Sequence, residues 1–209
     1  DLRRNVVRSA GEGLRYAWNS AVIRRVLLMM LIISTIGINF NVLLPVLASR
    51  TLQSGPEVFG MLSAVFGVGA LVGALISASL GRASMRVLLS GAAVFSCMEL
   101  VLAPLHAVWA VALALLGTGV AFSLYTSQSN STLQLTVTDP LRGRVLGIYG
   151  YVFFGTAPLG GLLAGWLAQT GGTQLAFLVA GIAGVLAVVY GLLDQRKSSN
   201  EPRMATTAA

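Results

Sequence analysis

The side chains that could do chemistry in this sequence are few, and most of them are uncharged hydroxyls and amides. Ser123, Ser127 and Asn130 follow one another at i, i+4 and i+7 within a long apolar stretch, and Thr126 lies beside them. On an α-helix this spacing places the side chains on one face. Such a stripe can line a water-filled path through an apolar medium, although its inner end could also be ordinary helix surface. We expect a path, because polar groups in membrane segments usually face a cavity.

Two further groups of residues could contact a solute in the same path. Asn39 and Asn41 are two positions apart, about 200° around a helix of 3.6 residues per turn, so they cannot face the same way. We expect at most one of them to face the path and the other to bond a neighbouring helix. Tyr149 and Phe153 offer aromatic surface to an amphipathic molecule, although core or lipid-facing packing uses the same residue types.

Glu99 is the carboxylate that stands inside an apolar stretch. It would lie about 20 Å deeper than Arg86 at the helical rise of about 1.5 Å per residue. A carboxylate within a membrane segment predicts a functional group, such as a site that carries a proton. We favour the alternatives, which are a side chain that snorkels toward water and a structural hydrogen bond.

Enzyme chemistry finds no support in the motifs. The sequence contains no HExxH, no Gly-x-Ser-x-Gly, no phosphate-binding loop and no paired acids. His106 is the single histidine and Cys97 the single cysteine, so neither an intrachain disulfide nor a zinc site is expected. We therefore expect no catalytic residue, no metal and no cofactor. The net charge of +7 does not indicate a nucleic-acid partner, because the basic residues form short clusters between apolar runs.

Composition indicates what surrounds the elements that carry these residues. Only 10% of the residues are charged, whereas a soluble domain has about 25%. A helix that crosses a bilayer needs about 20 mainly apolar residues, and the uncharged stretches have this length. A polar, glycine-rich breaker at 169–174 divides the longest of them. We predict an all-α membrane protein with a six-helix transmembrane domain over 26–193. The predicted spans are near 26–48, 58–80, 86–103, 108–131, 145–167 and 174–193.

Lysine and arginine gather on alternate connections between these spans. They occur before the first span, near 81–86 and 136–144, and after the last span, whereas Arg50 alone occupies the other connections. Cytoplasmic loops of membrane proteins carry this excess of basic residues. The pattern predicts a multi-pass protein with both ends in the cytoplasm.

The two ends of the chain have their own patterns. Residues 1–25 are predicted to be a cytoplasmic linker. In it Leu14, Trp18 and Val22 share one helical face, which indicates a short amphipathic helix on the inner leaflet or, alternatively, a solvated linker. Residues 194–209 are predicted to be a disordered cytoplasmic tail.

The second and fifth predicted spans share a pattern of residues. Gly60, Phe66 and Gly73 align at a constant offset with Gly147, Phe153 and Gly160. The two spans would cross the membrane in opposite directions, so the three-helix units that contain them would be related by inversion. Small residues four apart, as at Gly69 and Gly73 or at Gly161 and Gly165, favour close helix packing.

Several segments resemble a known family of transporters. Residues 133–145 (LQLTVTDPLRGRV), with Asp139, Arg142, Gly143 and Arg144, resemble the cytoplasmic loop between helices 10 and 11 of drug:proton antiporters of the major facilitator superfamily. Residues 158–166 (PLGGLLAGW) resemble helix 11 of the same proteins, and residues 59–74 resemble helix 8. The resemblance is to the macrolide-efflux and enterobactin-exporter group, and it covers essentially the whole chain as helices 7 to 12.

The resemblance implies gate residues as well as a fold. Asp139, Arg142, Gly143 and Arg144 would form a cytoplasmic gate loop, together with Gly81 and Arg82 in the counterpart of the first-half loop motif. That counterpart keeps only the Gly and the Arg of the family pattern, so Arg82 can equally be a plain basic residue of a cytoplasmic loop. The fold implied is one half of a major facilitator fold, built as two inverted three-helix repeats.

The function implied by the resemblance is secondary active transport by alternating access. The expected protein is a proton-coupled exporter of small amphipathic molecules, such as drugs or siderophores, in the bacterial cytoplasmic (inner) membrane. Its expected partners are the lipid bilayer, an N-terminal six-helix half, a small-molecule substrate and protons. The alternative is a self-contained six-helix membrane protein that works as a homodimer, a channel or a scaffold.

Overall fold

The computed structural model describes residues 2–200, and the side chains of residues 11–197 within them. Regular structure over this range is entirely helical. In chain order the elements are α1 Leu2–Asn19, α2 Ala21–Ile32, the π-helix η1 Ile33–Gly37, α3 Phe40–Val46, the π-helix η2 Leu47–Thr51, α4 Pro56–Ser79, α5 Met85–Leu102, α6 Val108–Thr136, α7 Asp139–Gly155 and α8 Ala157–Asn200.

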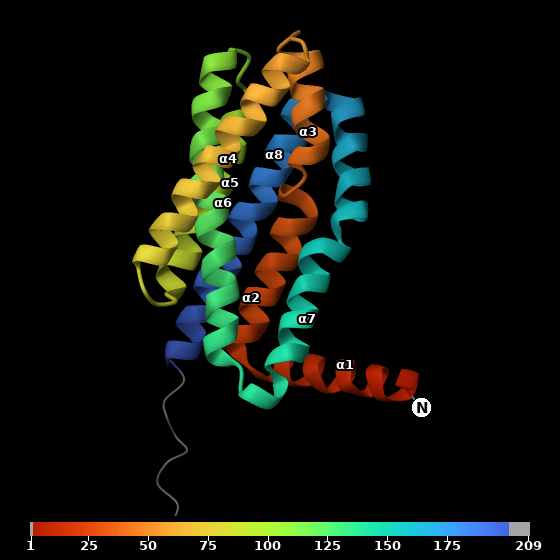
Figure 1. Cartoon of the computed structure of the whole chain (residues 1–209), viewed down its shortest axis with the longest axis vertical. Helices are drawn as coiled ribbons and strands as arrows, with labels where there is room; N and C mark the ends of the chain where they lie inside the picture. Colours follow the sequence, from red (N-terminus) through yellow and green to blue (C-terminus); the bar gives the residue numbers. More distant parts are fainter. Residues whose placement is uncertain (1, 201–209) are drawn as a thin grey trace, which may run out of the picture.

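The helices from α2 to α8 run up and down along one common axis (Figure 1). Five stretches are long and apolar enough to cross a membrane, and the last of them, Asp139–Lys197, is not one straight helix. Its backbone is non-helical at Gly171 and Gly172, and Gly172 has a φ of 73° that suits glycine. The chain reverses there, at the predicted breaker, so the described residues make six passes. The predicted all-α membrane fold with six spans is confirmed.

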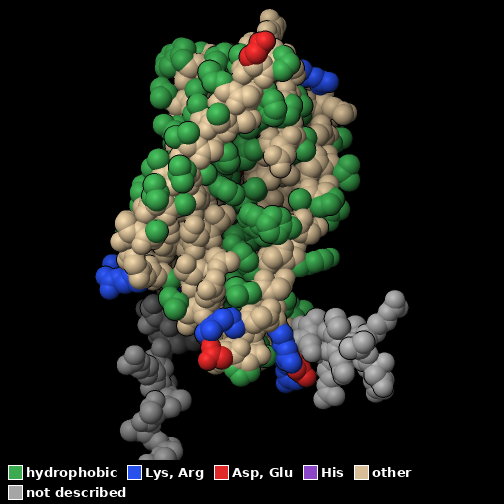
Figure 2. Space-filling view, viewed as in Figure 1, with side chains coloured by type: hydrophobic (Ala, Val, Ile, Leu, Met, Phe, Trp, Pro, Cys, Tyr) green, Lys and Arg blue, Asp and Glu red, His purple; other side chains and the backbone are tan. Residues whose placement is uncertain are grey.

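The charged side chains on the visible face of the bundle lie near its two ends (Figure 2). Figure 2 shows acidic and basic side chains near the ends of the visible face, with apolar and uncharged atoms over the length between them. A side chain in hydrocarbon is stabilised only if it is apolar or has its polar groups satisfied within the protein. The distribution therefore fits a bundle surrounded by lipid along its middle.

The first pass is broken, whereas the sequence predicts a continuous span over 26–48. The π-helix η1 ends at Gly37, and Ile38 and Asn39 have non-helical backbone before α3 begins. A second π-turn, η2, follows Pro45, whose missing N–H cannot bond the preceding turn. Such breaks leave backbone groups that other parts of the protein must satisfy.

The fifth pass bends between α7 and α8 (Figure 1). α7 ends at Gly155, and α8 begins at Ala157, directly before Pro158. Proline lacks the N–H that would continue the ladder and its ring crowds the preceding turn, so a bend at this point has a local cause.

Close helix contacts in the bundle follow a two-fold pattern. A Cβ atom added to Gly73 of α4 would overlap the carbonyl oxygen of Val120 in α6, and one added to Gly160 of α8 would overlap the carbonyl oxygen of Thr35 in η1. Gly73 and Gly160 are aligned residues of the predicted repeat. In each three-helix unit the second pass therefore touches the first pass of the other unit through the same glycine, as an inverted repeat requires.

α1 lies across one end of the bundle, which we call the α1 end (Figure 1). Gly13 and Ala17 are buried, while Leu14 and Trp18 are more than half exposed. Glu12 forms an ion pair of 2.6 Å with Arg144 of α7. The predicted apolar face thus exists on α1, but Val22 belongs to α2, because α1 ends at Asn19.

The last helix is longer than the sequence predicts. α8 continues to Asn200, so residues 194–200 of the predicted disordered tail are helical, and residues 201–209 lie outside the described residues. Asp194 accepts a hydrogen bond of 2.8 Å from Nε of Arg25, and Arg25 is only 3% exposed. This pair connects the first and last passes at the α1 end. Both of its residues lie just outside the predicted spans, because α2 begins before residue 26 and α8 continues past residue 193.

Candidate substrate path and buried carboxyl

The predicted polar stripe on α6 divides into two parts. Ser123 is buried against α4, where its Cβ would lie 3.0 Å from a Cβ atom added to Gly73. Thr126 turns back on its own helix and donates to the carbonyl oxygens of Phe122 at 2.9 Å and Ser123 at 3.3 Å. Ser127 and Asn130 remain half-buried, and Asn130 accepts from the amide of Gln134. Ser123 is thus buried and the hydroxyl of Thr126 is bonded to its own helix, whereas Ser127 and Asn130 are the half-buried part of the stripe that is left for other contacts.

The structure brings the predicted aromatic residues to the same region. The hydroxyl of Tyr149 donates to the carbonyl oxygen of Thr126 at 3.3 Å, which connects α7 to α6. The ring of Phe153 stacks on Tyr149 with 6.2 Å between centroids. Tyr149 is buried and Phe153 is half-buried, so the two rings form a firm surface beside the α6 stripe.

Asn39 and Asn41 point to different surroundings, as the sequence predicts. Asn39 is 4% exposed, and its amide donates to the carbonyl oxygens of Thr35 at 2.9 Å and Ile36 at 3.2 Å. It also packs directly on Gly160 of α8. Asn41 is exposed. Asn39 therefore satisfies the carbonyls of the broken first pass, and of the two only Asn41 has a face open to a substrate or to lipid.

The residues predicted as a gate loop lie at the α1 end, but four of them are helical. α7 begins at Asp139, so Asp139, Arg142, Gly143 and Arg144 occupy its first two turns. Proline in the first turn and an acidic residue beside the helix N-terminus both favour this start. Arg142 pairs with Asp139 at 2.7 Å and donates to the carbonyl oxygen of Gln134 at 3.2 Å.

Gly81 and Arg82 do form a connection, between α4 and α5. Gly81 has a φ of 64°, a conformation that glycine adopts without strain, and Arg82 is exposed. Both line a partly polar pocket of about 360 Å³ together with residues of α6. The two predicted gate segments are thus at the same end, on either side of the end of α6.

Gln128 is a buried polar residue that the sequence analysis did not single out. Its side-chain oxygen accepts from the backbone N–H of Ser84 at 2.8 Å, and its amide donates to the hydroxyl of Ser77 at 3.0 Å. It thereby holds α4, the start of α5 and α6 together. An amide side chain within an uncharged segment, next to Ser127, could have indicated a buried polar contact. The i, i+4, i+7 spacing of the other polar residues pointed instead to a different face of α6.

Five of the eight phenylalanines also meet in the interior, each from a different helix. Phe40 stacks on Phe66 at 5.0 Å between centroids and lies 6.1 Å from both Phe95 and Phe177. Phe122 completes the cluster at 5.7 Å from Phe66. Single phenylalanines spread over separate helices carry no sequence signal of this kind, because their meeting depends on how the helices pack.

Glu99 is fully buried, at 0% exposure, near the end of α5 that lies away from α1. Neither carboxyl oxygen has a hydrogen-bond partner among the described residues. Both oxygens would lie 3.1 Å from a Cβ atom added to Gly37, at the break of the first pass. Of the alternatives raised by the sequence, snorkelling is excluded by the burial, and no structural hydrogen bond is present within the described part.

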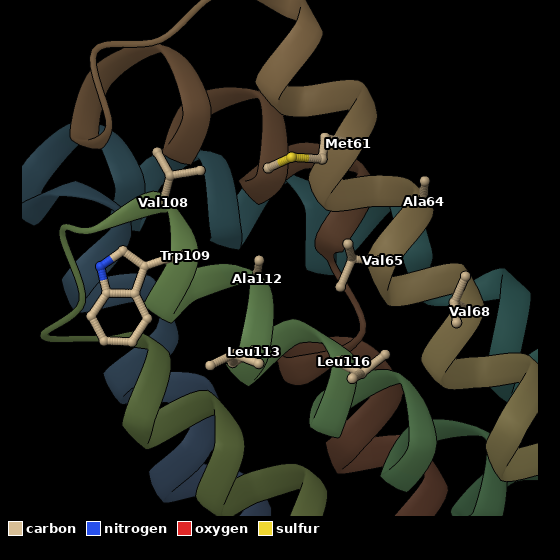
Figure 3. A pocket seen from close by; sticks show the side chains of 9 residues that line it. All are labelled: Met61, Ala64, Val65, Val68, Val108, Trp109, Ala112, Leu113 and Leu116. Carbon is tan, nitrogen blue, oxygen red and sulfur yellow. The ribbon is translucent and has the colours of Figure 1, made fainter.

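An apolar groove of about 890 Å³ opens on the outer side of α4 and α6, toward the end away from α1. Figure 3 shows its lining, with Met61, Val65 and Val68 on α4 and Trp109, Leu113 and Leu116 on the neighbouring α6. Its lining is apolar, so it offers contact area to another apolar surface but few polar groups to orient a ligand.

Comparisons with known proteins agree with this architecture. The chain is similar to the multidrug efflux pump Tap of Mycolicibacterium fortuitum, with 27% identity over 198 residues, which is 91% of this chain and 48% of that protein. It is also similar to the multidrug efflux pump Tap of Mycobacterium tuberculosis, with 30% identity over 176 residues, 83% of this chain and 42% of that protein. The chain thus spans about half the length of the curated relatives it matches. No solved structure matches.

A family profile extends over nearly the whole chain. The transmembrane secretion effector family of the major facilitator superfamily matches residues 2–207. Six passes arranged as two inverted three-helix units are the features that such a transporter half shows. The chain belongs to the transmembrane secretion effector family of major facilitator transporters.

Proposed function

We propose that this chain is the C-terminal half of a secondary active exporter that moves small amphipathic molecules, such as drugs or siderophores, out of a bacterial cell. The exporter works by alternating access, is driven by proton entry, and has both ends of this chain in the cytoplasm. The observation that carries the proposal is the family match over residues 2–207, joined to relatives that are multidrug efflux pumps.

The proposal of an N-terminal half is supported by how unevenly the apolar helices are buried within this chain. Only 17% of the apolar window of α4 is buried within the chain, against 56% for the first pass. The exposed side of α4 is apolar, with Leu71 and Leu75 more than 60% exposed, and it borders the groove of Figure 3. The relatives are about twice as long as this chain. We propose that their other half covers the α4 side.

The substrate path in this half follows the open part of the α6 stripe. Ser127 and Asn130 supply polar groups, and Tyr149 and Phe153 supply aromatic surface beside them. An amphipathic solute needs both kinds of contact. Asn41 and the exposed groups at the α1 end, including Arg82, are the remaining candidates for its route.

Mutations in the full-length gene test the path. Ser127→Ala and Asn130→Ala should each slow efflux of a fluorescent amphipathic dye from cells while membrane expression stays at the parent level. Ser90→Ala is the matched control, because Ser90 is an exposed serine of α5 that bonds only its own helix at Val87. Parent-level efflux in both path variants would refute this placement of the path.

The energy source is tested separately from the path. Efflux by the parent protein should stop when an ionophore collapses the proton gradient, and should return when the gradient is restored. Efflux that continues without the gradient contradicts proton coupling. Passive flux in either direction, with no dependence on any gradient other than that of the solute, would favour the channel alternative.

A further inference from the structure

The carboxyl group of Glu99 lies beside the break in the first pass between η1 and α3. It approaches Gly37, the last residue of η1, and a side chain at that position would lie 3.1 Å from either oxygen. The ring of Phe95 occupies the same side of Gly37, at 3.2 Å from the same added atom. The absence of a side chain at residue 37 is therefore what makes room for the acid beside the break.

The surroundings of Glu99 supply no countercharge. α5 packs on α6 and on the second part of α8, and Gly181 and Gly184 of α8 sit directly on Ser96. The titratable and charged groups of the neighbouring elements lie elsewhere along their helices or face outward. They are Tyr125 beside Gly91; Tyr190, Asp194, Arg24, Arg25, Arg86, Arg196 and Lys197 toward the α1 end; Arg50 beyond the first pass; and exposed Cys97 and His106.

An ionised carboxylate is not stable in such a place. Burying a charge without a partner costs far more free energy than burying the neutral acid. A carboxyl group in this position therefore either binds a proton or moves to a place where water or a donor can reach it. Glu99 has no hydrogen-bond partner among the described residues and is fully buried. Burial without a partner therefore favours the protonated acid over the carboxylate at this position.

The break beside Glu99 has groups that can respond to loss of that proton. Asn39 occupies the carbonyls of Thr35 and Ile36 with its amide, and the hydroxyl of Thr35 is buried with no partner in the described part of the chain. A newly formed carboxylate needs donors or water. We expect either one to involve a rearrangement of the segment from Thr35 to Asn39, because the acid borders this segment at Gly37, beside the ring of Phe95.

We propose that Glu99 is a proton-binding site whose charge state sets the conformation of the break at Gly37–Asn39. With the proton bound, the acid packs on Gly37 and the break keeps the form seen here. When the O–H bond breaks, the proton passes to water, the electron pair stays on the carboxylate, and the first pass must rearrange against α5 and α8. The role of this step in transport rests on the proposed proton-driven export, whereas proton binding itself does not.

Infrared spectroscopy tests proton binding directly, in the full-length protein reconstituted in liposomes. The parent protein should show the carbonyl band of a buried carboxylic acid that disappears as pH is raised. Glu99→Gln should lack this band, while Glu57→Gln should keep it, because Glu57 is exposed in the first turn of α4. If Glu99→Gln does not assemble, Glu99→Asp should move the band or its titration. A spectrum that titrates identically in the parent and in every assembled Glu99 variant overturns the proposal.

Transport measurements then separate this inference from the proposed function. In the same liposomes Glu99→Gln should lose uptake driven by a pH gradient, yet exchange substrate across the membrane at the parent rate, since glutamine resembles the protonated acid. A parent protein that ignores the pH gradient contradicts proton-driven export. A parent that responds to the gradient, with Glu99→Gln responding equally, contradicts the role of Glu99 alone.

Discussion

Buried polar side chains of the first pass show what single residues contribute. Asn39 is almost completely buried at the break and supplies two donors to carbonyl oxygens that the interrupted helix leaves free. Its neighbour Asn41 is exposed. The same residue type, two positions apart, therefore serves the fold at one position and leaves an open polar group at the other.

Asn39→Ala should destabilise the protein by about 1–3 kcal/mol, because two buried carbonyl oxygens lose their donor. The measurement is the thermal unfolding midpoint of the full-length protein in detergent. Asn41→Ala is the control and should leave the midpoint unchanged. Equal midpoints for the two variants would show that the amide of Asn39 does not support the break.

Glycines decide how closely whole helices approach in this bundle. A Cβ atom on Gly69 of α4 would overlap the carbonyl oxygen of Leu116, and one on Gly119 of α6 would overlap that of Phe66. The backbones of α4 and α6 therefore touch at Gly69, Gly73 and Gly119. The predicted close packing at Gly69 and Gly73 is present. In the fifth pass the backbone contact is at Gly160, while a Cβ atom on Gly161 would meet only the side chain of Val42 at 3.5 Å and Gly165 has open space around it.

Gly69→Ala should separate α4 from α6 and cost about 1–3 kcal/mol through overpacking. Gly11→Ala, on the exposed side of α1, should have the opposite effect, because Gly11 has no atom within 4 Å of an added Cβ and alanine is favoured over glycine in a helix by about 1 kcal/mol. Thermal unfolding of both variants measures the difference. A tolerated alanine at both positions would mean that the two helices are not in backbone contact.

At the scale of the whole molecule, both clusters of candidate gate residues lie at the α1 end. Arg82 is in the connection from α4 to α5, and Arg142 and Arg144 are in the first turns of α7. The ion pair of Arg144 with Glu12 attaches α1 to the same end. Under the proposed orientation this end faces the cytoplasm, where basic residues are enriched.

Labelling of single cysteines should reveal this orientation. In a Cys97→Ser background of the full-length protein, His106→Cys should react with a membrane-impermeant maleimide in intact cells. Arg82→Cys and Thr138→Cys should react only after the membrane is opened. Labelling of the last two variants in intact cells would reverse the orientation, and labelling of all three would argue against a sealed membrane topology.

The number of passes and their alternating directions follow from the sequence by itself. The length of each apolar stretch can be measured within that stretch alone, because each span must cross the same thickness of hydrocarbon. The reversal at Gly171–Gly172 is marked by polar and glycine residues. The inverted repeat was also visible in the aligned glycines. All of these features depend on stretches of the chain considered one at a time.

Only the tertiary structure decided which face of each helix meets which neighbour. These spans are apolar on every side, so periodicity does not distinguish an inward from an outward face. For this reason four features could not be predicted from the sequence: the contacts of Gln128 with three helices, the cluster of five phenylalanines, the break in the first pass at Asn39 and the burial of Glu99 against Gly37. Those positions result from which backbones approach closely, and that is settled by packing between segments far apart in the chain.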